Sequence, residues 1–254
     1  MGKFNMIARL ALIGACLLST QSFAAGGAAT EHANIDPGNI ASLQRGARNF
    51  MNYCSGCHSA QYVRFSTIGK HLELSDEQLV ENLMFNAQKT FETIKVAMPA
   101  EDSARWFGKT PPDLSLMARA KGADYVYSFL KGFYVEEGSP TGVNNTVLAG
   151  TSMPHVLWEL QGFNKANFVE HSETNAKGDT TTSVVFEGFE PLTEGSLSAE
   201  EYDEFVRDTV NFLSYIAEPM RAERRKLGVW VLIFLSIFLI LAIALKKEFW
   251  RDVH

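Results

Sequence analysis

The sequence predicts a mainly α-helical protein with a single transmembrane helix near its C-terminus. Several segments carry apolar residues at three- and four-residue steps, the pattern of an amphipathic helix. Residues 228–245 form a run of 18 uncharged residues, about 27 Å long as a helix and close to the hydrocarbon thickness of a bilayer. The 254 residues are 46% hydrophobic and 20% charged, which is typical of a folded chain.

The charge distribution excludes one class of partner. The formal net charge is −6, so the chain lacks the basic excess that holds a phosphate backbone, and we expect no nucleic-acid partner. Residues 25–220 hold 14 Lys and Arg against 26 Asp and Glu, a formal charge of −12. This acidity either keeps the domain soluble or steers a basic partner by long-range attraction.

The N-terminus has the pattern of a signal peptide over residues 1–24. Lys3 and Arg9 precede the apolar run Leu10–Leu18, and Ser22-Phe23-Ala24 fits a signal-peptidase site. A lipoprotein reading of Cys16 leaves about six apolar residues before the cysteine, short of the usual 7–15. Cleavage after Ala24 removes Cys16, so the exported chain keeps two cysteines.

Residues 221–254 predict a membrane anchor, with its helix at about 227–245, and a short tail. A buried core helix would be expected to show a polar face, whereas this run has none and is flanked by basic residues on both sides. Flanking charges alone do not decide the direction of insertion. The signal peptide does decide it: a translocated N-terminus followed by a stop-transfer helix leaves residues 25–226 outside and residues 246–254 in the cytoplasm.

The helices of the exported domain follow from periodicity and capping patterns. Apolar residues from Leu43 to Tyr53 predict a helix that runs into a cysteine pair. Ser75 opens a capping box and a helix through about Phe85. Pro111-Pro112 ends an irregular stretch, and helices at 113–120 and 123–133 follow, broken at Gly122.

The second half of the domain contains the only strands that the sequence predicts. Residues 136–156 are rich in loop-forming residues, and residues 170–195 alternate as in a small hairpin. A second capping box at Ser198 opens a helix that ends before Pro219. We therefore expect little sheet.

Cys54-Ser55-Gly56-Cys57-His58 carries the chemistry. Two cysteines three apart on one turn reach the two vinyl groups of a haem, and the adjacent histidine then lies under the iron. A zinc site would need two further ligands, and the mature chain has no second cysteine pair. A thioredoxin-like pair would follow a strand, and a plain disulfide would leave His58 without a role.

The second axial ligand has three candidates. Met98 and Met153 each precede a proline in a non-helical segment, where a loop can present a thioether, and His155 is two residues from Met153. Most methionines are core packing. Chain order favours Met153, because in small c-type cytochromes the ligand methionine follows a proline-bearing loop, and Pro111-Pro112 fits that loop.

The motifs, taken in order, resemble the cytochrome c1 family, the haem-carrying subunit of the ubiquinol:cytochrome c oxidoreductase (cytochrome bc1 complex). They are Tyr53-Cys54-Ser55-Gly56-Cys57-His58-Ser59, Pro111-Pro112-Asp113-Leu114-Ser115, Ala118-Arg119-Ala120, Asp124-Tyr125-Val126, Met153-Pro154 and Ala217-Glu218-Pro219 before one anchor. The resemblance implies a class I cytochrome c core with enlarged loops. In that fold the helix containing Gly46 and Phe50 crosses the helix at 198–217.

The resemblance also implies roles for single residues. Cys54 and Cys57 would bond one haem c, His58 and Met153 would ligate its iron, and a carbonyl of the Pro111-Pro112 turn would orient His58. The run Met153-Pro154-His155-Val156-Leu157-Trp158 departs from the mitochondrial pattern and resembles the bacterial branch.

The resemblance to the family implies roles for two more residues that their sequence context alone does not indicate. Arg119 would pair with a haem propionate, since a guanidinium matches both carboxylate oxygens, and Tyr125 would lie nearby. Taken by themselves, Arg119 fits a solvated helix residue and Tyr125 a core aromatic residue.

The implied function is electron transfer. The family would accept one electron from a Rieske iron–sulfur protein, next to cytochrome b in a dimeric complex, and pass it to a cytochrome c. His/Met ligation leaves no open iron site for oxygen or peroxide chemistry. Two other functions remain: a stand-alone tethered cytochrome c that shuttles electrons to a terminal oxidase, and a haem sensor or peroxidase with an open sixth position.

Overall fold

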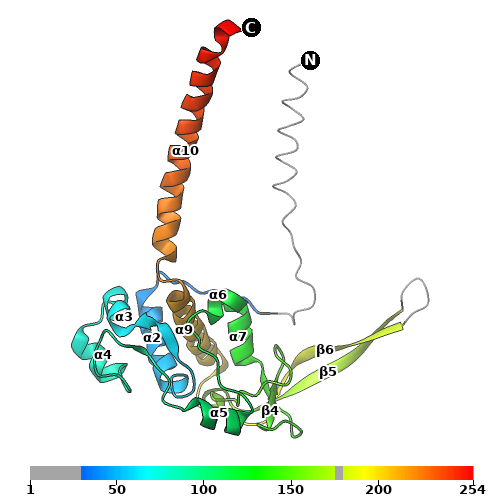
Figure 1. Cartoon of the computed structure of the whole chain (residues 1–254). Helices are drawn as coiled ribbons and strands as arrows, with labels where there is room; N and C mark the ends of the chain where they lie inside the picture. The colour runs from blue at the N-terminus through cyan, green and yellow to red at the C-terminus, as the bar shows by residue number, and fades with distance from the viewer. Residues whose placement is uncertain (1–29, 175–179, 254) are drawn as a thin grey trace.

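The structure is a computed structural model that describes residues 30–174 and 180–253. A helical domain surrounds the pair α2 (Ile40–Tyr53) and α9 (Ala199–Ala217), and one long helix, α10 (Arg221–Phe249), leaves the domain beside the end of α9 (Figure 1). The predicted signal peptide at 1–24, its cleavage site and Cys16 lie outside the described residues.

Helices α2 and α9 cross closely, as predicted. A side-chain cap from Asn39 starts α2, and the predicted capping box of Ser198 and Glu201 starts α9. At the crossing, a Cβ on Gly46 would lie 2.0 Å from the Asp208 carbonyl oxygen, so only glycine permits this approach. Phe50 is fully buried one turn further on. This crossing fixes the end of α2, where the cysteine pair begins.

Residues 59–110 contain more regular structure than the sequence predicted. The elements are β1 (Ala60–Arg64), α3 (Phe65–Leu72), α4 (Asp76–Asn82), β2 (Thr93–Ile94) and α5 (Ala100–Phe107), with β1 and β2 antiparallel. Only α4 was predicted. Its capping box at Ser75 is present, but the helix ends at Asn82, three residues before the predicted end.

The next segment corrects one predicted boundary. Helices α6 (Met117–Lys121) and α7 (Ala123–Lys131) break at Gly122, as predicted, where φ is +91°. Helix α6 starts at Met117 instead of residue 113, because the Asp113 carboxylate closes a turn on the backbone of Ser115. Residues 113–116 therefore belong to the loop that follows Pro111-Pro112.

The remaining strands form two further two-stranded antiparallel sheets. Strand β3 (Phe133–Val135) pairs with β4 (Val143–Asn145), a short strand inside the segment predicted as loop. After α8 (Trp158–Gln161), β5 (Asn164–Thr174) pairs with β6 (Thr180–Pro191). This hairpin begins six residues earlier than predicted and projects from the domain (Figure 1).

Helix α10 is long and apolar enough to cross a membrane. The candidate membrane span is Glu223–Phe249, 27 residues whose 18-residue apolar window has a mean hydropathy of 2.9, and none of that window is buried in the domain. The helix is longer than the predicted 227–245 because the charged residues on both sides of the apolar run are also helical. A short 3₁₀ turn, Arg251–Val253, follows it. Among the residues that the structure describes, one helix thus fits a single membrane span.

Candidate haem-binding site

The cysteine pair lies on a tight turn at the end of α2. The Cys54 amide still donates to Phe50, and the amides of Cys57 and His58 both donate to the Cys54 carbonyl, at 3.1 and 2.8 Å. Both thiols are free and half-buried. Burial raises the pKa of Cys54 to about 12, with the neighbouring Cys57 adding to the effect, and burial raises the pKa of Cys57 as well. Both side chains are therefore neutral thiols at pH 7.

His58 is oriented by a backbone carbonyl. Its Nδ1 lies 2.8 Å from the Pro112 oxygen, 54 residues along the chain. Burial lowers the pKa of His58, although the Pro112 contact and the charge of Asp113 oppose this. A neutral imidazole whose Nδ1 is held by a carbonyl keeps Nε2 for a metal. The carbonyl is that of Pro112, while Pro111 precedes it in the same turn.

Hydrogen bonds to Asp113 fix the loop of Pro111-Pro112 beside His58. Its Oδ2 accepts from the Ser59 hydroxyl at 2.6 Å and the Gln61 amide at 2.9 Å, and its Oδ1 accepts from the Ser115 amide at 2.8 Å. Leu114 adds a backbone bond to Ser59 at 2.8 Å. Burial raises the pKa of Asp113, but these hydrogen bonds outweigh burial and hold the pKa below its ordinary value.

We refer to Asp113 and its three donors, Ser59, Gln61 and Ser115, as the Asp113 clamp. Sequence reasoning quoted Asp113 only as part of a motif and missed this role. Part of this role could have been predicted from the sequence, because an Asp side chain commonly accepts a hydrogen bond from the amide two residues later and so forms an Asx-turn. Its partners across the loop come from tertiary structure alone.

Met153 and Met98 differ in their packing. Both are half-buried. Met153 packs against the hydrophobic core, and its amide lies 3.4 Å from the Thr151 hydroxyl. Met98 is not among the described residues that pack against that core. The packing favours Met153 as the side chain that can be held in a fixed position.

His155 is enclosed by aromatic rings. Its ring stacks on Phe133 at 5.0 Å with a 7° interplanar angle, and Phe163 meets it edge-on at 6.2 Å. Neither ring nitrogen hydrogen-bonds a described residue. Burial lowers the pKa of His155 to about 4, with small opposing effects from Gly162 and Gln161, so the ring is neutral at pH 7.

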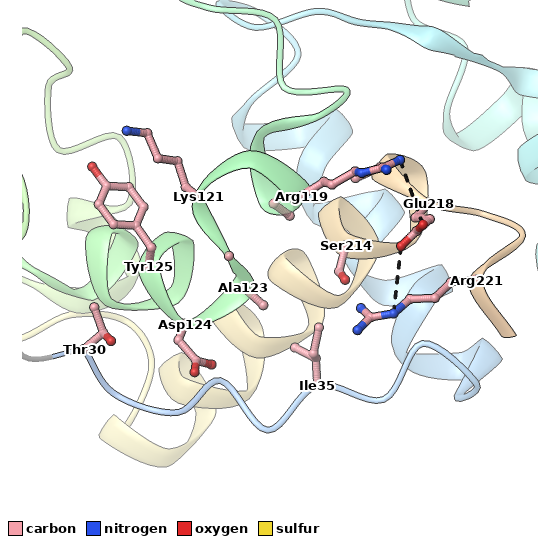
Figure 2. A pocket seen from close by; sticks show the side chains of 13 residues that line it. Thr30, Ile35, Arg119, Lys121, Ala123, Asp124, Tyr125, Ser214, Glu218 and Arg221 are labelled. Atoms are coloured by element: carbon pink, nitrogen blue, oxygen red, sulfur yellow. Dashed lines mark ion pairs between the residues drawn. The ribbon is translucent and has the colours of Figure 1, made fainter. Parts of the chain in front are cut away.

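Arg119 and Tyr125 line one pocket of about 930 Å³ between α6, α7, the end of α9 and the segment before α2 (Figure 2). The Arg119 side chain is 61% exposed, and its Nη1 lies 3.9 Å from Glu218. Tyr125 stacks on Phe129 at 6.4 Å, and Lys121 lies over its ring at 5.6 Å. Neither His58 nor Met153 lines this pocket.

The residues expected at one site therefore fall into two groups. The structure joins the cysteine pair and His58 to the Pro111-Pro112 loop, and it places Arg119 and Tyr125 together at a separate pocket. Within residues 30–174 and 180–253, no group of three His, Cys, Asp or Glu side chains could hold a metal ion.

Comparison with known proteins identifies the family. A model of the Cytochrome C1 family matches residues 35–253. The chain is 46% identical to cytochrome c1 of Allochromatium vinosum, over 90% of this chain and 91% of the relative. The chain belongs to the cytochrome c1 family. The resemblance, the mainly α fold and the C-terminal apolar helix predicted from the sequence are confirmed.

Two other relatives carry different names. A protein of Nitrosomonas europaea named ammonia monooxygenase gamma subunit is 38% identical over 88% of each chain. The mitochondrial cytochrome c1 haem protein of Saccharomyces cerevisiae is 27% identical over 84% of this chain and 67% of the relative. Cytochrome c1 proteins are haem proteins of electron transport, and the apolar helix α10 fits their membrane attachment.

Proposed function

We propose that this chain is the cytochrome c1 subunit of a cytochrome bc1 complex, which takes one electron at a time from a Rieske iron–sulfur protein and passes it to a cytochrome c. Cytochrome b and the Rieske protein would be its partners, and the complex would be dimeric. The observation that carries the proposal is the placement of His58. A Cys-x-x-Cys-His turn with two free thiols has its histidine held by the Pro112 carbonyl, in a family of haem proteins.

The residues present fit a covalent haem c. Cys54 and Cys57 would hold it through thioethers, and His58 would offer Nε2 to the iron, with Met153 as the second axial ligand. The family resemblance would add Arg119 at a propionate with Tyr125 close by, whereas in the structure both line the pocket of Figure 2, which neither His58 nor Met153 lines. A haem bound in this way supplies a reversible one-electron couple whose potential is raised by the methionine ligand.

The chain's own part is to hold and orient. The Asp113 clamp fixes the loop that carries the Pro112 carbonyl, so the imidazole of His58 keeps one tautomer and one ring orientation. The acidic domain, with its formal charge of −12 over residues 25–220, would attract a basic carrier. Quinol oxidation would take place in the partner subunits.

The proposed placement follows from the sequence ends and α10. After loss of residues 1–24, residues 25–220 would form a haem domain in the periplasm, and residues 221–254 would form the anchor and a cytoplasmic tail in a bacterial inner membrane. A tethered cytochrome c shuttle is the second candidate. The additional elements between His58 and Pro111 and the projecting β5–β6 hairpin favour a subunit with partner surfaces over a shuttle.

The test is purification of the full chain from membranes in mild detergent through a C-terminal tag. We expect b-type haem and a Rieske protein to co-purify, with ubiquinol:cytochrome c reductase activity. A chain that comes out alone with only c-type haem would identify the shuttle. A high-spin, ligand-accessible iron would instead support a sensor or peroxidase and contradict Met153 as ligand.

A further inference from the structure

The β5–β6 hairpin leaves the domain with both of its outer edges unpaired. Among the residues that the structure describes, β5 and β6 form a sheet of their own, and no third strand pairs with either of them. The base of the hairpin is fixed, because Phe168 packs on Tyr134 of β3 with 5.6 Å between the ring centroids. Beyond this contact the hairpin extends to the side of the domain, away from α10 (Figure 1). Its edges are therefore open to a neighbouring molecule.

Large apolar side chains are exposed on both faces of the hairpin. Phe168 lies opposite Phe186 in the register, and the next pair, Val169 and Val185, points to the other face because successive side chains alternate. These four side chains are 37–44% exposed, and Val184 is 64% exposed. Two strands alone are marginally stable in water, and a contiguous exposed apolar surface marks a site of contact. The hairpin is therefore a candidate contact surface.

The two strands of the hairpin differ in charge. Residues 180–186 of β6 are seven in a row without Asp, Glu, Lys, Arg or His, and six of them are β-branched or aromatic. Strand β5 carries Lys165, Glu170 and Glu173. Charged side chains on an edge strand hinder its pairing with another chain. Strand β5 has this protection, and residues 180–186 of β6 do not.

Charge and symmetry favour a second copy of this chain as the partner. A basic carrier would find no carboxylate on residues 180–186, whereas two acidic domains can meet there without placing one carboxylate opposite another. Antiparallel pairing of a strand with the same strand of a second copy is twofold symmetric, so one edge serves both copies. Two copies anchored through α10 in one membrane would also present their hairpins at the same height.

We propose that residues 180–186 of β6 pair antiparallel with the same residues of a second copy, so that the two hairpins form one four-stranded sheet between two domains. This inference deepens the proposed function and rests on the dimeric complex proposed there. Two strands of seven residues, each about 23 Å long, form a smaller contact than the roughly 1,000 Å² of a stable interface between free proteins. Anchoring in one membrane supplies the high effective concentration that so small a contact requires.

The test is cross-linking of cysteine variants of the full chain in membranes. With the pairing centred on residues 180–186, the introduced cysteines of V184C lie within about 8 Å, the diagonal distance between paired strands. A bismaleimide of that length should then give a cross-linked dimer on a denaturing gel. The wild-type chain is the blank.

E170C is the matched control on the same hairpin. Glu170 lies opposite Val184 in the register, but on β5. In the proposed sheet two β6 strands separate the two β5 strands, which places them about 14 Å apart. E170C should therefore give about tenfold less dimer than V184C. Equal yields would mean random encounter of the two chains and would overturn the proposal.

V185K adds to β6 the charge that its edge lacks. In V184C/V185K we expect the yield of dimer to fall about threefold or more, because a charged edge strand resists pairing. Covalent haem, stained on the same gel, checks that each variant folds. An unchanged yield in V184C/V185K, or no dimer in V184C with normal haem, would contradict the β6 contact. V185C takes the place of V184C if that variant fails to accumulate.

Co-purification separates this inference from the proposed function. If V184C gives no dimer while b-type haem and a Rieske protein co-purify with the chain, the complex stands and the hairpin contact is wrong. If V184C cross-links but the chain carries only c-type haem, the contact between copies stands and the assignment to a cytochrome bc1 complex is wrong.

Discussion

Replacing Asp113 with Asn should loosen the proline loop that orients His58. The Oδ2 atom of Asp113 accepts two of the three hydrogen bonds, from the Ser59 hydroxyl and the Gln61 amide, while Oδ1 accepts from Ser115. In the variant, an NH₂ group replaces Oδ2. The Ser59 hydroxyl can turn and accept, but the Gln61 amide would face another donor.

The expected loss of stability in the loop follows from the number of hydrogen bonds that D113N removes. One hydrogen bond to a charged group disappears, and its donor loses its partner, which costs about 1.5–3 kcal/mol. At about 1.4 kcal/mol per tenfold, local opening of the loop becomes roughly 10- to 100-fold more frequent. Hydrogen exchange of the backbone amides of Gln61, Leu114 and Ser115 in the haem-loaded chain measures this opening directly.

The control is Asp36→Asn. Asp36 accepts from the Gly38 amide at 2.9 Å in a similar turn, away from the cysteine pair. Its substitution should leave exchange around residues 59–62 and 112–116 unchanged. If D113N also leaves that exchange at the wild-type rate, the reasoning that the Asp113 clamp holds the loop is refuted.

The pH dependence of the clamp has a definite sign. The pKa of Asp113 is held below its ordinary value of about 3.9 in the folded chain. Its stabilising contribution is therefore complete above that ordinary value and is lost as the pH falls through the depressed value. Between pH 5 and 8, the ratio of D113N to wild-type exchange rates should be constant, and a drift with pH would point to another group.

Four further predictions concern the fold, the ligands and the carrier. Gly46→Ala forces a Cβ toward the Asp208 carbonyl, 2.0 Å away, and should destabilise the domain by at least about 1–3 kcal/mol in thermal unfolding; Gly138→Ala, where a Cβ meets nothing within 4 Å, is the control. Met153→Leu should lower the haem potential while covalent haem remains, and an unchanged potential would move the ligand to Met98 or His155. Cys57→Ala should lose or weaken covalent haem in a denaturing-gel haem stain, and a normal stain would contradict the attachment model. Added salt should slow electron transfer to the carrier, whereas a flat response would leave solubility as the role of the acidic surface.

Elements with local signals were predictable from the sequence. Ser75 and Ser198 begin α4 and α9 because both capping boxes are satisfied within four residues. The break at Gly122 has a positive φ that favours glycine. Each of these features is decided by residues that are neighbours along the chain, so tertiary contacts had little to change.

The elements that were missed lack such local signals. Helix α5 has no side-chain cap, since its N-cap is Pro99, and α3 follows Arg64 with no cap hydrogen bond. In β1 the buried residues do not alternate with exposed ones, so a period of two cannot reveal the strand. Helix α3 is only eight residues long, and helices this short depend on packing against the rest of the domain.

The candidate site also combines features that local sequence predicts with features that it does not. The spacing of Cys54, Cys57 and His58 is local, so the chemistry could be inferred from five residues. The contacts around the candidate residues are not local: the Pro112 carbonyl reaches His58 across 54 residues, and in the pocket that Arg119 lines, Glu218 reaches Arg119 across nearly a hundred. Periodicity and spacing carry no information on contacts at such separations.

Asp113 and Glu218 each join distant parts of the chain through a carboxylate, and the groups that contact the two carboxylates differ in kind. Asp113 accepts mainly from hydroxyl and amide groups, whose positions are fixed by the backbone, so it can hold a loop still. Glu218 meets guanidinium groups on long side chains from two separate elements, so its pairing can be redistributed when one partner is removed. The first arrangement suits a constant orientation of His58. The second can exchange partners without moving the loop beside His58, so of the two carboxylates only Asp113, when replaced by Asn, should change how often that loop opens.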